Sequence, residues 1–211
     1  MPTTNHLNDL LGGWQTIVMM SLLGLVLALI VSFVQPLRYS STARLLILQS
    51  DSSVDAYTAS RAEERIADNL STIVYTSTFF DQVIKSGFRI DDNSFPTDPN
   101  KRRREWAKTI DASVSVGSGL LTLTAYHQDV QQAEQLVRAV AFVLTDRVGE
   151  YTSGSTIQVR LVDEPLNSRW PVKPNVLANA VSGLFLGGFF GVLYVFIQTE
   201  RIRRRHQLIH E

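Results

Sequence analysis

Residue types that could carry out acid–base, nucleophilic or metal chemistry occur in this chain, but their spacing assembles no site. Of the 4 histidines, three lie near the chain ends and His127 stands alone, so no metal-binding set arises. Acidic residues occur as neighbours, as in Glu63-Glu64 and Asp163-Glu164, and neighbouring side chains on a helix or strand point apart. No serine lies in a G-x-S-x-G turn. We therefore expect no catalytic residues, no metal, no cofactor and no enzymatic activity.

A basic run is the strongest candidate for ligand binding. It comprises Lys101, Arg102, Arg103 and Arg104, with Trp106 two residues further on. One interpretation is a solvated helix face, partly balanced by Asp98 and Glu105. The other is a patch for anionic lipid headgroups, an undecaprenyl-linked pyrophosphate or an acidic glycan, with Trp106 stacking on lipid or sugar. The sequence leaves both open.

Small residues recur at every fourth position in two apolar segments. The stripes are Gly24, Ala28 and Ser32 in the first, and Gly183, Gly187 and Gly191 in the second. Such spacing lets helix backbones approach closely, which is how helices associate in lipid. The stripes therefore predict a helix-packing face, either between the two segments of one chain or between neighbouring subunits.

Both segments have the length and composition of membrane spans. The overall composition, with 20 basic and 20 acidic side chains and 45% hydrophobic residues, would suit a soluble domain, but the apolar residues are concentrated at the two ends. We predict transmembrane helices over residues 14–35 and 175–198, each long enough to cross roughly 30 Å of hydrocarbon. A cleaved signal peptide is the alternative for the first, and a buried core helix for the second. The lack of Lys and Arg before residue 14 disfavours the signal peptide, and the lack of any charge in the second disfavours the core helix.

The charged flanks predict the topology. A basic tail over residues 199–211 carries Arg201, Arg203, Arg204 and Arg205, and the positive-inside rule places such a cluster in the cytoplasm. Two spans return the N-terminal residues 1–13 to the same side, which leaves residues 36–174 outside the cytoplasm. The arginines serve as topology anchors that also touch anionic lipids, or they form part of a docking segment for a partner.

A proline-rich segment precedes the second span. Pro165, Pro171 and Pro174 each fix their own φ and bias the preceding residue toward extended backbone. We expect residues 165–174 to form a stiff strut, beginning where the last strand ends. Trp170 and Lys173 within it are suited to anchoring at the membrane interface.

The outer segment reads as an α+β domain. Strands are predicted over residues 39–48, 111–116, 120–126 and 156–165, and helices over 61–87, 100–110 and 129–151. A break in the first helix would fall at the β-branched stretch 72–78. Asp98 and Asp129 are expected N-caps, the latter in a capping box with Gln132. The order β-α-(short α)-β-β-α-β predicts a ferredoxin-like arrangement, with two helices on one face of a four-stranded sheet.

An ordered set of segments carries a family resemblance over nearly the whole chain. "YSSTARLLI" follows the first span, "LVRAVAFVLTDRVGEY" follows a hairpin, and "VDEPLNSRWPVKPN" leads into the glycine-bearing span. Together they resemble the Wzz chain-length-determinant domain of polysaccharide co-polymerases. The resemblance implies a bacterial inner-membrane protein that regulates the chain length or export of O-antigen, capsule or exopolysaccharide, and that assembles as a homo-oligomeric ring around a polymerase or flippase.

Two departures define the variant that we expect. Only "TSGS" joins the second long helix to the last strand, where the family inserts a long helical hairpin. The tail has no phosphate loop and no tyrosine, so it resembles the short form without its own kinase, which implies a separate tyrosine kinase as a partner beside the membrane lipids. No nucleic-acid partner is expected. The alternative is a membrane-anchored module that binds glycan or lipid as a sensor and has no role in polymer length.

Overall fold

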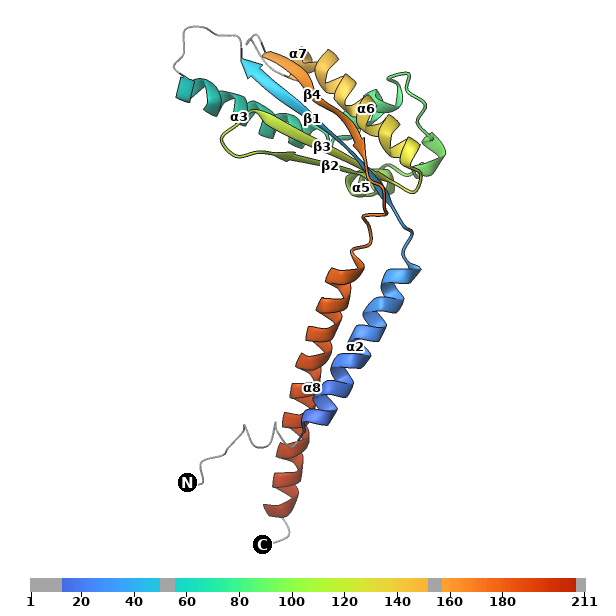
Figure 1. Cartoon of the computed structure of the whole chain (residues 1–211), viewed down its shortest axis with the longest axis vertical. Helices are drawn as coiled ribbons and strands as arrows, with labels where there is room; N and C mark the ends of the chain where they lie inside the picture. Colours follow the sequence, from blue (N-terminus) through green and yellow to red (C-terminus); the bar gives the residue numbers. More distant parts are fainter. Residues whose placement is uncertain (1–12, 50–55, 152–156, 208–211) are drawn as a thin grey trace. The chain divides into compact units, whose positions relative to one another are not determined.

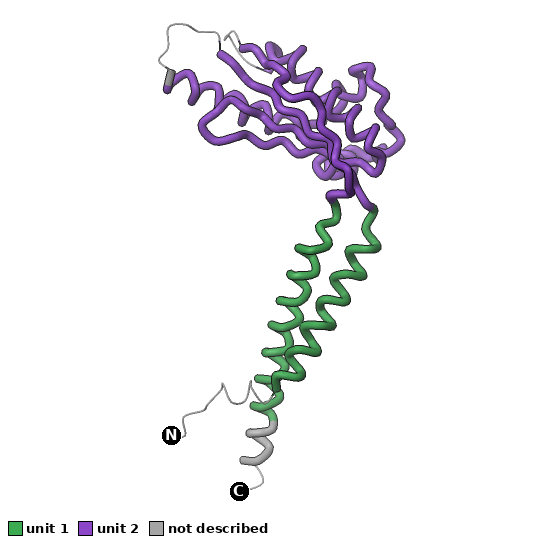
Figure 2. Tube along the Cα trace, viewed as in Figure 1, with its two compact units in different colours: residues 1–36, 173–211 green, residues 37–172 purple. Residues whose placement is uncertain are grey.

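The computed structural model describes residues 13–49, 56–151 and 157–207. Two compact units divide the chain (Figure 2): Leu37–Val172 form one, and the two chain ends, Met1–Pro36 with Lys173–Glu211, form the other. The first unit is an α+β domain and the second is a pair of helices (Figure 1).

A four-stranded antiparallel sheet forms the frame of the α+β domain. The strands are β1 (Tyr39–Gln49), β2 (Ile110–Val114), β3 (Leu120–His127) and β4 (Ile157–Asn167), arranged in the order β2-β3-β1-β4. All four strands were predicted from their alternating or β-branched residues. The expected turn between β2 and β3 contains Gly117 with φ +74°, a left-handed backbone that favours glycine.

Five α-helices are found among the described residues of the domain. They are α3 (Ala56–Ile73), α4 (Ser77–Ile84), α5 (Pro99–Thr109), α6 (Val130–Asp146) and the short α7 (Val148–Tyr151), with a 3-10 turn at Asp92–Ser94. The expected break in the first long helix separates α3 from α4, where the Thr76 side chain accepts a hydrogen bond from the amide of Phe79 and so caps the new helix. The predicted caps at Asp98 and Asp129 are confirmed.

The capping box at the start of α6 is wrong. The Asp129 carboxylate accepts from the amide of Gln131, whereas the Gln132 side chain turns away to the loop before the 3-10 turn. There its oxygen accepts from the amide of Asp91 at 3.0 Å and its nitrogen donates to the carbonyl of Arg89 at 3.2 Å. The loop offers Gln132 two backbone partners, and the local box offers only one.

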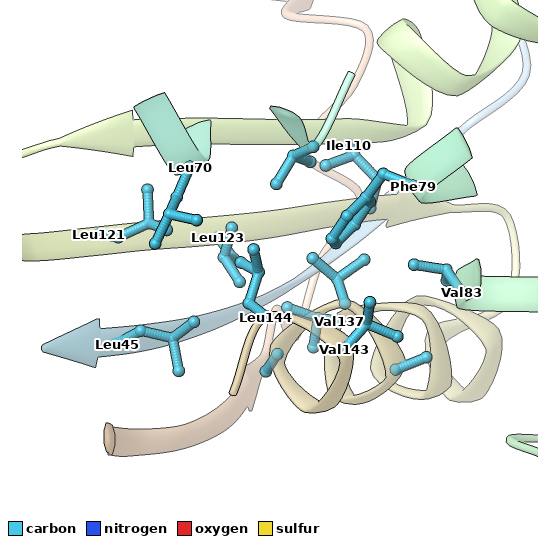
Figure 3. Close-up of a cluster of buried hydrophobic side chains, with 14 of the residues drawn as sticks. Leu45, Leu70, Phe79, Val83, Ile110, Leu121, Leu123, Val137, Val143 and Leu144 are labelled. Atoms are coloured by element: carbon cyan, nitrogen blue, oxygen red, sulfur yellow. The ribbon is translucent and has the colours of Figure 1, made fainter. Parts of the chain in front are cut away.

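The core lies on one face of the sheet, under the helices (Figure 3). Alternate residues of β1, among them Leu45, and of β3, among them Leu123, are fully buried, because a strand presents every second side chain to the same face. Leu70, Phe79 and Leu144 meet them from the helices. The opposite face of β1 and β3 is more polar and is bridged, for example, by the hydroxyls of Thr42 and Thr124 at 3.0 Å.

Pro165 does not end the last strand. β4 continues to Asn167, with Pro165 inside it and two register irregularities against β1, between Thr42 and Arg44 and between Arg44 and Leu45. A proline lacks the N–H that a central strand needs, but edge strands and bulges tolerate it. The expected strut over residues 165–174 is therefore wrong for its first three residues, which belong to the sheet.

The second unit pairs α2 (Trp14–Val34) with α8 (Val176–Gln207). Each is long and apolar enough to cross a membrane, over Trp14–Val34 and Val176–Arg201. The predicted spans 14–35 and 175–198 agree closely with these bounds. The predicted basic tail over residues 199–211 stays a prediction as to its side of the membrane, and its residues as far as Gln207 continue α8. The stretch after Gly191 contains no Gly or Pro and is rich in Arg, Gln and other good helix formers that keep the helix going.

Candidate functional site

The two glycine stripes pack against each other within one chain. A Cβ added at Gly24 would overlap the carbonyl oxygen of Gly183 and lie 2.9 Å from Cα of Gly187. A Cβ at Gly191 would lie 2.9 Å from Cα of Ile17. The backbones of α2 and α8 therefore touch where side chains are smallest. Of the two interpretations that the sequence left open, the structure supports packing between the two helices of one chain.

A polar pair extends this interface toward the beginning of α8. The side-chain nitrogen of Asn179 donates to Oγ of Ser32 at 2.8 Å, and Ser32 is 1% exposed. Ala28, the middle residue of the first stripe, meets Gly183 between this pair and Gly24. Sequence reasoning missed Asn179, although its position four residues before Gly183 continues the same stripe and was the signal that could have found it.

Asparagine also begins α8. Oδ1 of Asn175 accepts from the amide of Ala178 at 3.0 Å, directly after the proline segment. This side chain satisfies one of the amides that the first turn of a helix leaves without an intrahelical partner. Sequence reasoning missed this cap too, and the Pro-Asn pair before an apolar run was the available signal.

The structure divides the basic run on α5. Arg102 lies on the inner side, with its guanidinium carbon 5.2 Å from the centroid of the Phe80 ring and its Nη2 3.8 Å from the carboxylate of Asp81. Lys101, Arg103 and Arg104 are exposed and form no ion pair with any described residue. Three cations of the run, and not four, are therefore open to an external anion.

The interpretation in which Trp106 stacks on a ligand is wrong. Its side chain is 1% exposed, and Nε1 donates to the carbonyl of Val74 at 2.7 Å. Edge-on contacts to Phe80 and Phe95, with ring centroids 5.1 and 5.9 Å away, complete its surroundings. Trp106 follows Arg102 by four residues and so shares its helix face, and that face is the one that the core takes.

Glu105 joins α5 to the first residues of the domain. Its Oε1 accepts from Nη2 of Arg38 at 2.6 Å, and its Oε2 accepts from Nζ of Lys108 at 3.3 Å. The hydrogen bond from Arg38 is the largest cause that lowers the pKa of this carboxyl below its ordinary value of 4.5. The ion pair thus fastens the helix to the point at which the chain enters the sheet.

Glu105→Gln is expected to remove part of the acid sensitivity of the domain. Because the folded-state pKa is lowered, the stabilisation is present above pH 4.5 and is lost as the pH falls through the lowered pKa. Unfolding followed by circular dichroism from about pH 7 to about pH 3 should show a difference between wild type and variant of about 1 kcal/mol at neutral pH that shrinks in acid. Glu164→Gln, at an exposed position of β4, is the matched control, and an equal effect of both variants would contradict the role of Glu105.

The remaining proline segment is hydrogen-bonded to the start of β1. The amide of Ser168 donates to the carbonyl of Ser40 at 2.8 Å, and the amide of Val172 donates to the carbonyl of Arg38 at 2.8 Å. Trp170 lies between these bonds and is 79% exposed. Pro171 lies inside this paired stretch and Pro174 follows it. The predicted anchors stay predictions: Trp170 has an exposed aromatic ring, and Lys173 is exposed.

The arginine tail is described only in part. Arg201 is exposed at the end of the apolar stretch of α8. The backbone of Arg203, Arg204 and Arg205 is helical, but their side chains lie outside the described residues. The "TSGS" connection also lies outside them.

The groups weighed for catalysis have structural partners. Oε1 of Glu63 accepts from the amide of Gln49, and Oε1 of Glu64 accepts from the amide of Gly117. Nδ1 of His127 accepts from the amide of Asp129. Within the described ranges, no group of three or more His, Cys, Asp and Glu side chains is arranged to hold a metal ion.

Comparison with known proteins adds no family to these observations. No known protein-family model matches the chain, and no curated protein matches it closely enough to count as a relative. A functional conclusion therefore depends on the sequence and on the geometry of the two units.

Proposed function

We propose that the chain is a two-span polysaccharide co-polymerase or adaptor of the bacterial inner membrane, which regulates the chain length or export of a surface polysaccharide by scaffolding. One observation carries this proposal. The first and last segments of the α+β domain are hydrogen-bonded to each other, at Arg38–Val172 and Ser40–Ser168, and continue into two helices that pack through glycine. A domain held at both ends in this way is suited to an organising role.

The strand order supports a ferredoxin-like arrangement for the domain. A split βαβ unit places the third strand between the first two, and a fourth strand follows the second helix. The observed order β2-β3-β1-β4, with α3 after β1 and α6 after β3, agrees with that requirement. We infer that the domain has this fold and that it lies outside the cytoplasm, between the two spans.

The basic end of α8 supports the orientation. Arg201 ends the apolar stretch, and three further arginines follow on the same helix. Clusters of this kind mark the cytoplasmic side, so both chain ends face the cytoplasm in the proposed topology. There they are available to anionic lipids and to a separate tyrosine kinase.

The proposed ring of subunits has to use surfaces other than the glycine stripes. Gly24, Gly183 and Gly187 are taken up by contacts within the chain. Large apolar side chains such as Leu27, Phe185 and Phe189 instead face outward from the helix pair, where neighbouring subunits, a polymerase or flippase, or lipid would meet them. We propose a ring because the family that the sequence resembles assembles as rings.

Deletion of the gene is expected to change the length distribution or the amount of a surface polysaccharide. Extracted polymer would be sized by gel electrophoresis for wild type, deletion and a strain complemented with the intact gene. If both length and amount are unchanged, the co-polymerase role is wrong. The exposed cations Lys101, Arg103 and Arg104 favour the alternative, a glycan- or lipid-binding sensor, and binding by the purified chain without any polymer phenotype would select it.

A further inference from the structure

The exposed side of α5 carries four cations. Lys101, Arg103, Arg104 and Lys108 are exposed, while Trp106 and Thr109 are buried on the opposite side. Glu105 is the only acidic residue of this helix, and Arg38 already holds it at 2.6 Å. The basic face, as we call these four exposed cations, therefore presents a net positive charge: Lys108 is paired with Glu105 at 3.3 Å, and the other three have no ion pair with any described residue.

Covalent connections limit how far this face can be from the ends of the spans. Arg38 follows Val34, the last residue of α2, by four residues, and extended backbone covers at most ~14 Å over that stretch. Val172, whose amide is bonded to the carbonyl of Arg38, precedes the first residue of α8 by four residues as well. This distance limit follows from the length of the connecting chain alone. Because Arg38 forms an ion pair with Glu105, α5 lies close to Arg38 and a similar limit applies to it.

Exposed apolar side chains occur at the same point of the domain. Leu37 is 56% exposed, Trp170 is 79% exposed and Val172 is 41% exposed, and Arg169 beside them is also exposed. Tryptophan and aliphatic side chains next to cations are typical of surfaces that lie at the headgroup level of a bilayer.

We propose that the basic face of α5 binds the headgroups of anionic phospholipids, with Trp170 as the apolar contact beside it. This inference rests on the membrane-spanning part of the proposed function and is independent of any role in polysaccharide length. Anionic lipids attract clustered Lys and Arg, and the attraction falls off within a Debye length. Lipid is favoured over an acidic glycan because the reach of the short connections and the exposed apolar side chains both suit a bilayer surface.

A single reporter can test this in the intact chain. The protein contains no cysteine, so Ala107→Cys, at an exposed position of α5, takes one donor fluorophore. Energy transfer to acceptor-labelled lipid headgroups would be measured in nanodiscs of phosphatidylcholine, with and without phosphatidylglycerol, at low and high salt. We expect phosphatidylglycerol to raise the transfer at low salt, and high salt to reverse this gain.

A triple substitution and a matched control make the test specific. Lys101→Gln with Arg103→Gln and Arg104→Gln should lower the ratio of docked to undocked domain roughly 100-fold. The control variant combines Arg61→Gln, Arg65→Gln and Arg160→Gln. It removes the same charge near the other end of β1, roughly 35 Å along the strand, where Glu63 contacts Gln49. This control should keep the full response. Circular dichroism should show similar thermal unfolding for both variants, since all six side chains are exposed and the one ion pair removed, Arg61–Glu64, is a surface pair.

Each outcome decides the inference. Energy transfer that does not depend on phosphatidylglycerol, or a triple variant that responds like wild type, overturns it. A third outcome also overturns it: the energy transfer does not depend on phosphatidylglycerol, and soluble alginate changes it only in protein that keeps the three cations. That outcome would assign an acidic glycan as the ligand instead. Because the readout is lipid contact, it can fail while the polysaccharide phenotype holds, and the reverse is also true.

Discussion

Trp106→Ala is expected to lower the free energy of unfolding of the α+β domain by about 3–5 kcal/mol. The substitution removes the largest fully buried side chain of the domain, which packs edge-on against Phe80 and Phe95. It also leaves the buried carbonyl of Val74 without the indole donor at 2.7 Å, which adds a desolvation cost. Because Trp106 lies between α4 and the 3-10 turn, the backbone amides of both should lose protection from hydrogen exchange in this variant.

The exposed Trp170 provides a control of the same residue type. Trp170→Ala should change the stability by less than about 0.5 kcal/mol, since the side chain is 79% exposed. Trp106→Phe should fall between the two, at about 1–3 kcal/mol, because it keeps an aromatic ring and loses the donor. Unfolding of the full chain in detergent, followed by near-ultraviolet circular dichroism, would measure all three. Equal effects of Trp106→Ala and Trp170→Ala would contradict the assignment of Trp106 to the core.

Gly187→Ala is expected to destabilise the pairing of α2 with α8 by about 1–3 kcal/mol. Its Cβ would overlap the carbonyl oxygen of Met20 and lie 3.0 Å from Cα of Ser21. These are backbone atoms, so a whole helix has to move. Gly188→Ala is the matched control, because its Cβ meets only the hydroxyl of Ser21 at 2.8 Å, and a hydroxyl can rotate away. The adjacent glycines should therefore differ sharply.

An engineered disulfide can report this pairing. The side chains of Ser32 and Asn179 meet at 2.8 Å, and the chain has no cysteine of its own. Ser32→Cys with Asn179→Cys should form a bond within one chain on oxidation, seen as a shifted monomer on a non-reducing gel. Gly187→Ala should reduce its yield, and Gly188→Ala should not. A disulfide that forms mainly between chains would show instead that the stripes join subunits.

Packing of the glycines within one chain limits the surfaces through which subunits could assemble. In the sequence, a small-residue stripe fits packing within a chain and packing between chains equally well, because both bring backbones together in lipid. The structure uses both stripes at once, with Gly24 against Gly187. Any oligomer of this protein would therefore use the large apolar side chains on the outside of the helix pair or the α+β domain.

Local patterns predicted most elements of the domain. Strand alternation over residues 39–48 and 120–126, the caps at Asp98 and Asp129, and the helix break within residues 72–78 depend on neighbours in the sequence, and each has its counterpart in the structure. Trp106, Gln132 and Pro165 were misread for a common reason. Each was interpreted from the residues beside it, whereas its partner is distant along the chain: the Val74 carbonyl, the Asp91 amide and the edge position next to β1.

The sequence by itself determined where the two apolar helices lie, which strands and helices form between them, and which residues are small enough for close helix packing. Those properties depend on composition and periodicity, and both can be determined from short segments of the sequence. Only the tertiary structure decided that the stripes meet within one chain, that α5 turns Arg102 and Trp106 inward and Lys101, Arg103 and Arg104 outward, and that Arg38 and Val172 are joined at the root of the domain. Each of these depends on which surface a distant segment covers, and no local pattern specifies that.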